Sequence, residues 1–116
     1  MSIHQDVSTA LATVLANSWA VQLPPEPVFP AIVFEIDSAP EPGWTSAGEG
    51  YDQHTVTVSF LLETIEEFEA LAASCRTAFE AMETYMYEED YGDGDYEPNP
   101  QVFMKYIVFR HRTRRS

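Results

Sequence analysis

Cysteine is almost absent from this chain of 116 residues, and long apolar runs are missing. The single cysteine, Cys75, excludes a disulfide within the chain and is typical of a reducing compartment. Its position among apolar neighbours predicts an inert buried thiol rather than a reactive one. No apolar run approaches the roughly 20 residues that a membrane span requires, and the N-terminus lacks the basic start of a signal peptide. We therefore expect one soluble cytoplasmic domain, residues 1–116.

Positive charge is also scarce, with 6 Lys and Arg against 19 Asp and Glu and a net charge of −13. All acidic residues lie at or before Glu97, and five of the six basic residues lie at or after Lys105. This balance argues against a general nucleic-acid-binding surface, because phosphates would be repelled. It also leaves a short basic end, residues 111–116, which is either a solvated tail or a contact for acidic partners.

Apolar residues at steps of three and four predict two amphipathic helices. The longer spans residues 64–86, where Thr64 and Glu67 form a capping box at the N-terminus. The shorter spans residues 2–17 and begins with a second capping box at Ser2. The apolar stripe of the longer helix is Ile65, Phe68, Leu71, Ala72, Cys75, Ala78, Phe79, Met82 and Met86, and that of the shorter is Ile3, Val7, Ala10, Leu11, Val14 and Leu15.

Three segments have the residue pattern of β-strands, residues 31–37, 54–62 and 101–110. Residues 19–30 contain four prolines, which exclude a helix and predict an extended connector. The expected core faces of the first two strands are Ile32, Phe34 and Ile36, and Val56, Val58, Phe60 and Leu62. The chain therefore predicts an α+β fold, in which a mostly antiparallel sheet of three to four strands carries both helices on one face.

The third strand is apolar on both faces, which is more than helices on a single side of the sheet can cover. One face consists of Val102, Met104, Tyr106 and Val108, and the other of Phe103, Lys105, Ile107 and Phe109. We expect the surplus face to be covered by another subunit. The strand and tail residues assigned to this interface are Phe103, Lys105, Ile107, Phe109, Arg110, Arg112, Arg114 and Arg115.

Two stretches predict irregular loops. Residues 38–53 are rich in glycine and proline and form either a wide hairpin connection or a protruding arm. Trp44 and Tyr51 in this loop are candidate contact anchors, and the alternative is that these aromatics fold back onto the body. Residues 87–100 are acidic and contain glycine and proline, which predicts a solvated or partner-facing loop.

The search for chemistry returns no catalytic, cofactor or metal site. His4, His54 and His111 are far apart, and none has another His or Cys at ligand spacing, so zinc is not expected. Neither a phosphate-binding glycine loop nor a nucleophile elbow is present. The acidic residues Asp90, Asp93, Asp95 and Glu97 resemble a calcium loop in composition, but Pro98 stands where an EF-hand needs glycine. We therefore expect a protein that is not an enzyme.

The order of the elements is informative once these segments are placed. A short N-terminal helix precedes a strand opened by Phe29-Pro30. A polar loop then leads into a strand of the type H-x-V-x-V-x-F, from His54 to Phe60, and a helix with an acidic start follows directly. This pattern resembles the tail terminator (tail completion) proteins of tailed bacteriophages and related minor tail proteins. The acidic stretch at residues 87–100 departs from it.

The resemblance implies a structural protein of the virion tail or neck, assembled in the host cytoplasm. Such proteins form a ring, commonly a hexamer, that stacks on the tail tube protein and offers the head–tail connector a docking face. DNA passes through the lumen of the ring without specific binding. Another phage neck or head–tail joining protein is the alternative within this class, and an acidic DNA-mimic-like binding module is the alternative from a different class.

Overall fold

The computed structural model describes residues 2–15, 18–20, 29–40, 50–94, 97–98 and 101–114. The elements are α1 (Ile3–Val14), β1 (Ser18–Ala20), β2 (Ala31–Pro40), β3 (Tyr51–Leu62), α2 (Glu67–Glu80), β4 (Tyr85–Asp93), β5 (Glu97–Pro98) and β6 (Gln101–Arg114). Neither described helix is long and apolar enough to cross a membrane.

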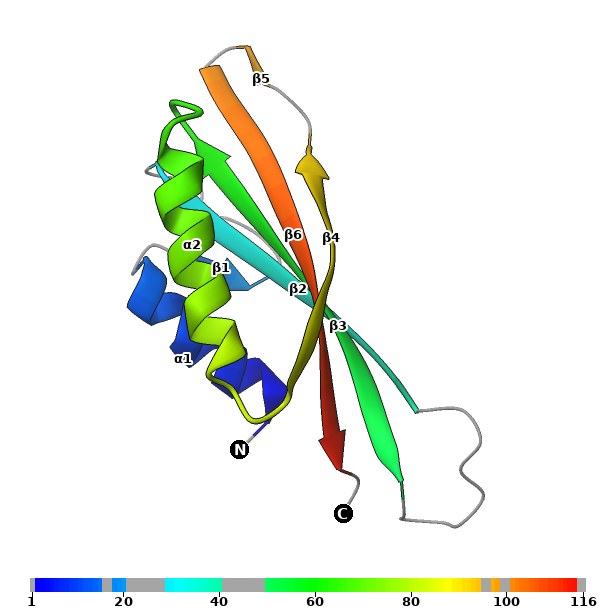
Figure 1. Cartoon of the computed structure of the whole chain (residues 1–116). Coiled ribbons are helices and arrows are strands. Elements are labelled where there is room, and N and C mark those ends of the chain that lie inside the picture. Colours follow the sequence, from blue (N-terminus) through cyan, green and yellow to red (C-terminus); the bar gives the residue numbers. More distant parts are fainter. Residues whose placement is uncertain are drawn as a thin grey trace.

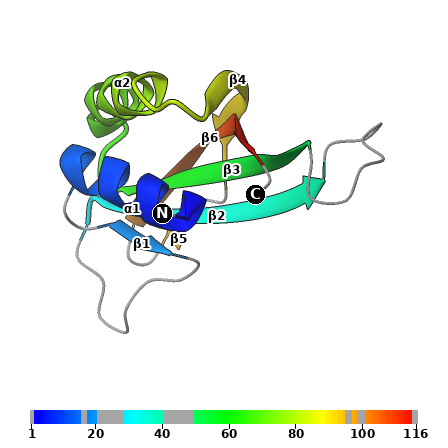
Figure 2. The same cartoon turned by 90° about the horizontal axis from the view of Figure 1, so that it is seen from below.

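The long strands form one antiparallel sheet in the order β2-β3-β6-β4. The short β1 adds to β2 in parallel, and β5 pairs with the start of β6. Both helices lie on one face of this sheet, with α2 toward β4 and α1 toward β1 and β2 (Figures 1 and 2). The predicted α+β class, with its mostly antiparallel sheet and two helices on one face, is confirmed.

The core lies between the sheet and the two helices, as the alternation of the strands predicts. In β2 and β3 the even-numbered apolar residues face the helices, and β6 contributes its odd-numbered ones. Helix α1 inserts Val7 and Leu11, and α2 inserts Ala72, Cys75 and Phe79. The remaining buried core residues include Ile32, Phe34, Val56, Val58, Phe60, Leu62, Ile107 and Phe109.

Each helix shows one hydrogen bond of its predicted capping box. The Ser2 hydroxyl accepts a hydrogen bond from the Gln5 N–H at 3.2 Å. At α2 the Glu67 carboxylate accepts from the Thr64 N–H at 3.0 Å, which is the return bond of a capping box. The Thr64 hydroxyl donates to the same carboxylate at 3.2 Å, and the helix begins at Glu67, directly after its N-cap residue Glu66.

The prediction of a helix over residues 64–86 is wrong at both ends. Ile65 precedes the helix and is 46% exposed, and Met86 lies in β4 and is 39% exposed. Both were assigned to the apolar stripe by spacing alone. The chain leaves the helix after Glu80 because the following residues pair with β6, and this tertiary pairing overrides local helix propensity.

Strand extends into three segments that the sequence does not predict to be strand. The acidic stretch 87–100 begins within β4, which pairs with β6 over Tyr85–Asp93. Its charge is tolerated because three of its carboxylates form ion pairs, with Arg76, Lys105 and Arg110. Residues 111–114 of the basic end belong to β6, and the connector begins with the last two residues of β1.

The connection between β2 and β3 is shorter than the predicted loop at 38–53, because both strands extend into it. The pair runs on until Pro40 lies opposite Asp52. The molecule is consequently elongated, with extents of 52 × 23 × 23 Å. Figure 1 shows the β2–β3 hairpin projecting well beyond the two helices. We call this projection the hairpin arm.

Candidate assembly surface

The face of β6 that was predicted to meet another subunit is the core face. Ile107 and Phe109 have no exposed surface, and Phe103 packs against the core cluster. Ile107 and Phe109 are therefore core residues that a partner of the folded chain cannot contact, while the role of the partly buried Phe103 stays a prediction. Because both faces of this strand are apolar, the sequence alone could not decide which face the helices cover.

The opposite face of the sheet carries the other row of β6. Met104, Tyr106 and Val108 are half-buried there, beside Ser59 and Thr57 of β3. The Tyr106 ring lies against Gly92 of β4, where an added Cβ would stand 3.0 Å from the Tyr106 hydroxyl. No described helix covers this face, and it presents a mixture of aromatic, aliphatic and hydroxyl groups.

The predicted basic residues are largely engaged within the chain. Lys105 pairs with Asp93 at 2.6 Å, and Arg110 pairs with Glu89 at 2.8 Å. The Arg112 guanidinium lies 3.7 Å from the centre of the Tyr51 ring, a cation–π contact. Tyr51 is the first residue of β3 rather than a loop residue, and its role as a contact anchor stays a prediction.

The remaining predicted interface residues divide between the surface and the part of the chain outside the described residues. Arg114 is exposed at the end of β6. Trp44 and Arg115 lie outside the described residues. The calcium-like residues Asp90 and Asp93 belong to β4, and Asp95 also lies outside the described part. Among the described residues no group of three His, Cys, Asp or Glu could hold a metal ion.

A groove that the sequence did not predict runs between α2 and β4. Its volume is about 780 Å³, and its lining includes Ile65, Phe68, Ala72, Arg76, Tyr91 and Lys105. The lining comes from three separate parts of the chain, which explains why no local pattern indicates it. The Lys105 ammonium lies 5.1 Å from the centre of the Phe68 ring, a cation–π contact between two lining residues.

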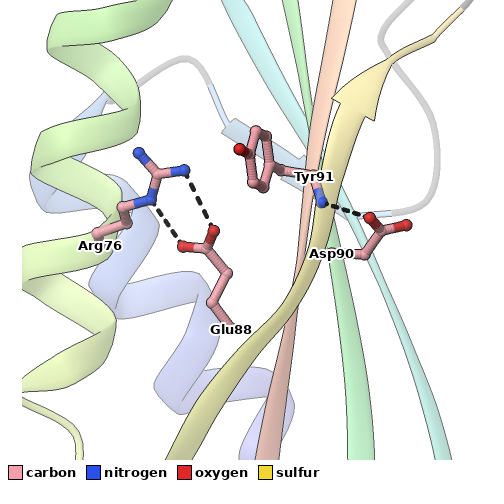
Figure 3. A network of polar contacts seen from close by, with 4 residues as sticks. All are labelled: Arg76, Glu88, Asp90 and Tyr91. Atoms are coloured by element: carbon pink, nitrogen blue, oxygen red, sulfur yellow. Dashed lines mark hydrogen bonds and ion pairs between the residues drawn. The ribbon is translucent and has the colours of Figure 1, made fainter.

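An ion pair connects α2 and β4 beside this groove. The Nε of Arg76 donates to Glu88 Oε1 at 2.7 Å, and its Nη2 donates to Glu88 Oε2 at 3.2 Å. This hydrogen bonding raises the pKa of Arg76. Figure 3 shows Arg76 reaching from α2 toward Glu88 and Tyr91, while Asp90 turns to the other side of β4. Arg76 also lies 5.8 Å from the centre of the Tyr91 ring.

Cys75, beside Arg76 on the core side of α2, is buried as predicted. Burial raises the pKa of its thiol to about 12, so the reactive thiolate is not formed at neutral pH.

Two buried histidines lie side by side in the sheet, at the base of the hairpin arm. His54 and His111 are opposite each other in the β3–β6 register and are 5% and 0% exposed. The sequence does signal this position, because both share the parity of the core residues in their strands. Burial lowers the pKa of His54, and burial together with the neighbouring His54 lowers the pKa of His111 to about 4.

The two rings differ in their hydrogen bonds. His54 Nδ1 lies 2.7 Å from the Ser38 hydroxyl, and its Nε2 lies 2.7 Å from the Thr113 hydroxyl. His111 Nδ1 lies 3.0 Å from the Thr84 hydroxyl, while its buried Nε2 has no hydrogen-bond partner among the described residues. A serine and a histidine are therefore brought together, but Thr113 occupies the position where a catalytic triad has a carboxylate.

No protein-family model matches this chain, and no curated protein matches it. A solved structure does. The chain superposes on a protein chain in the virion of a native gene transfer agent (GTA) particle with a TM-score of 0.63. It shares its fold with that virion chain. The identity is 14%, and the superposition covers 97% of this chain and 95% of the virion chain, so the whole fold is shared rather than one motif.

Proposed function

We propose that this protein is a structural component of a phage-like virion, and more specifically a ring-forming tail terminator. The observation that carries the proposal is the superposition on a chain of the gene transfer agent virion over 97% of this chain. An identity of 14% transfers no individual residue, so the role of each surface rests on its own physical argument. The order of helices and strands resembles that of tail terminator proteins, which supports this position within the virion.

The physical character of the chain fits a subunit of a ring around DNA. A net charge of −13 repels phosphates, which suits a lumen through which DNA must move without sticking. The projecting hairpin arm and the groove between α2 and β4 are two different surfaces on one molecule. A contact between unlike surfaces is heterologous, and repeated contacts of this kind close into a ring when the rotation between subunits allows.

The first prediction is that the purified protein forms a ring, which we expect to be a hexamer. Native mass spectrometry gives the number of subunits, and negative-stain microscopy shows whether they enclose a central opening. Assembly should persist at micromolar protein concentration, as expected for a virion component. A protein that remains a monomer or dimer under these conditions would contradict the proposal and is the behaviour expected of an acidic DNA mimic.

A second measurement separates the terminator from other neck proteins. The ring is added to purified phage tail tubes, and the length and end structure of the tubes are measured by electron microscopy. A terminator binds the tube end and stops further growth. A ring that forms but leaves tube growth unchanged would retain the virion role and remove the terminator assignment.

A further inference from the structure

The edge strand β4 has fewer apolar contacts with the core than the other long strands have. Tyr85, its first residue, is the one that packs against the core cluster. Further along the strand the large side chains point into solvent, with Met86 39%, Tyr87 49% and Tyr91 64% exposed. Burial of apolar surface is the main force that keeps an element in place, so β4 beyond Tyr85 is weakly held by the core.

The backbone pairing of β4 is also weaker than that of its neighbours. β4 is the last strand of the sheet, and β6 is its partner on one side. The register with β6 shifts between Tyr85 and Tyr87 and again between Glu88 and Asp90, and each shift disrupts the ladder locally. β6 does not depend on this pairing, because it also pairs with β3 along the whole of Tyr51–Leu62.

Three ion pairs connect β4 to the rest of the fold. They join carboxylates of β4 to cations of α2 and β6, and the pairs are Glu88 with Arg76 at 2.7 Å, Glu89 with Arg110 at 2.8 Å, and Asp93 with Lys105 at 2.6 Å. All six side chains keep some exposure to solvent, and a surface pair of this kind changes an equilibrium by up to about fivefold. Three such pairs together are enough to influence whether a weakly packed strand stays in place.

The two ends of β4 are held unequally. At its start, the hydroxyl of Thr84 lies 3.0 Å from Nδ1 of the buried His111, and Tyr85 packs on the core. At its other end, the Gly94 N–H donates a backbone hydrogen bond to the Met104 carbonyl at 2.8 Å. We therefore expect the strand to open from its C-terminal end and to hinge near its first residue.

We propose that β4 is a releasable edge strand, in which residues 86–93 separate from β6 as a unit while the rest of the fold stays closed. The three ion pairs set how often this happens. The remaining fold keeps its own support, because Phe109 of β6 packs on Phe79 of α2 at a centroid distance of 4.6 Å. The proposal goes beyond the ring-forming function and does not depend on it.

Release of β4 changes the surface that the sheet presents. Residues 105–110 of β6 lose the strand that lies beside them, and their backbone groups on that side become unpaired. An unpaired strand edge is the form in which a sheet adds an extended segment of another chain. Opening of β4 therefore controls access to this edge of β6.

Hydrogen–deuterium exchange of the purified protein, measured by mass spectrometry, tests the proposal without any substitution. We expect the amides of residues 86–93 to be less protected than those of residues 56–60 in β3 by at least about a hundredfold, because β4 opens locally and β3 exchanges only when the whole chain unfolds. Equal protection of the two strands would overturn the proposal, since β4 would then open only by global unfolding.

Carboxylate substitutions in β4 test the role of the ion pairs. Glu89→Gln and Asp90→Asn each remove one negative charge from adjacent positions, but only Glu89 forms an ion pair with a described residue. Asp90 Oδ1 accepts a hydrogen bond from the Tyr91 N–H at 2.9 Å, which an asparagine can also accept. Protection of residues 86–93 should fall about threefold in Glu89→Gln and stay unchanged in Asp90→Asn, which is the matched control.

The triple variant Glu88→Gln, Glu89→Gln, Asp93→Asn should lower the protection of residues 86–93 by at least about tenfold and leave β3 unchanged. Circular dichroism shows whether each variant is folded, and the comparison of β4 with β3 in the parent stands without the variants. The proposal is wrong if the triple variant protects β4 as well as the parent does, or if the loss of protection is equal in β3 and β4.

Discussion

Replacing Phe79 with alanine should lower the free energy of unfolding by about 3–5 kcal/mol. The side chain is fully buried, and its ring contacts Phe109 edge-on at a centroid distance of 4.6 Å and His111 at 5.3 Å. Its removal takes apolar surface out of the core and leaves a cavity that the surrounding sheet and helix cannot close completely. Equilibrium denaturation with urea, followed by circular dichroism, measures the change.

Two other substitutions on α2 provide a comparison for the stability loss expected of Phe79→Ala. Phe68 is half-buried at the groove, where its ring contacts Phe60 at 5.5 Å, so Phe68→Ala should cost less than Phe79→Ala. Glu69 is exposed, and Glu69→Ala should change stability by no more than about 0.5 kcal/mol. A ranking in which Glu69→Ala is the most damaging of the three would show that the helix faces the sheet differently.

The parts of the fold that the sequence predicts correctly are those in which a single face is buried. Val56, Val58 and Phe60 alternate with polar residues. This two-residue period identifies the side of β3 that meets the core. In α2 the spacing of Ala72, Cys75 and Phe79 does the same with a period of 3.6. Both signals are local, and the structure adds nothing that would override them.

The parts that the sequence misses depend on contacts between distant segments. Four of the nine residues of β4 are acidic, three of them consecutive, so the segment is expected to be a loop. It becomes a strand because β6 supplies backbone partners and Arg110 and Lys105 supply charge. β6 is apolar on both faces, so its sequence does not show which face points to the core. The register with β3 determines this, because it places Ile107 opposite the core residue Val58. No pattern within either segment contains this information.

The candidate surfaces follow the same rule. The groove unites Ile65 and Arg76 of the α2 region with Tyr91 of β4 and Lys105 of β6, and the sequence gives no hint that these residues meet. The arm was anticipated as a glycine-rich loop, yet its length comes from continued pairing of β2 with β3 as far as Pro40. The glycine and proline content of residues 38–53 indicates a loop, and only the strand register shows how far the hairpin arm projects.

Stability should fall as the pH is lowered from 6.5 toward 4, and His111 should account for about 2–3 kcal/mol of the loss. Its pKa is lowered to about 4 in the folded chain, because the ring is buried and His54 lies beside it. Between these two values the unfolded chain binds a proton at His111 and the folded chain does not. Stability from this group is therefore complete above pH 6.5 and is lost as the pH falls toward 4. The lowered pKa of His54 acts in the same direction.

Denaturation midpoints measured every half pH unit test this expectation, with His111→Phe as the informative variant and His4→Gln as its control. His4 is exposed on α1, and His4→Gln controls for the replacement of a histidine elsewhere in the chain. In His111→Phe the decline between pH 6.5 and 4 should be smaller by about 2–3 kcal/mol, since the titrating group is gone while the carboxylates are common to all three proteins. Proton NMR of the parent follows the His111 ring directly and does not depend on the variant folding. A His111 resonance that titrates near pH 6.5 in the folded protein would disprove the burial effect, and parallel stability profiles for the parent and His111→Phe would contradict it equally.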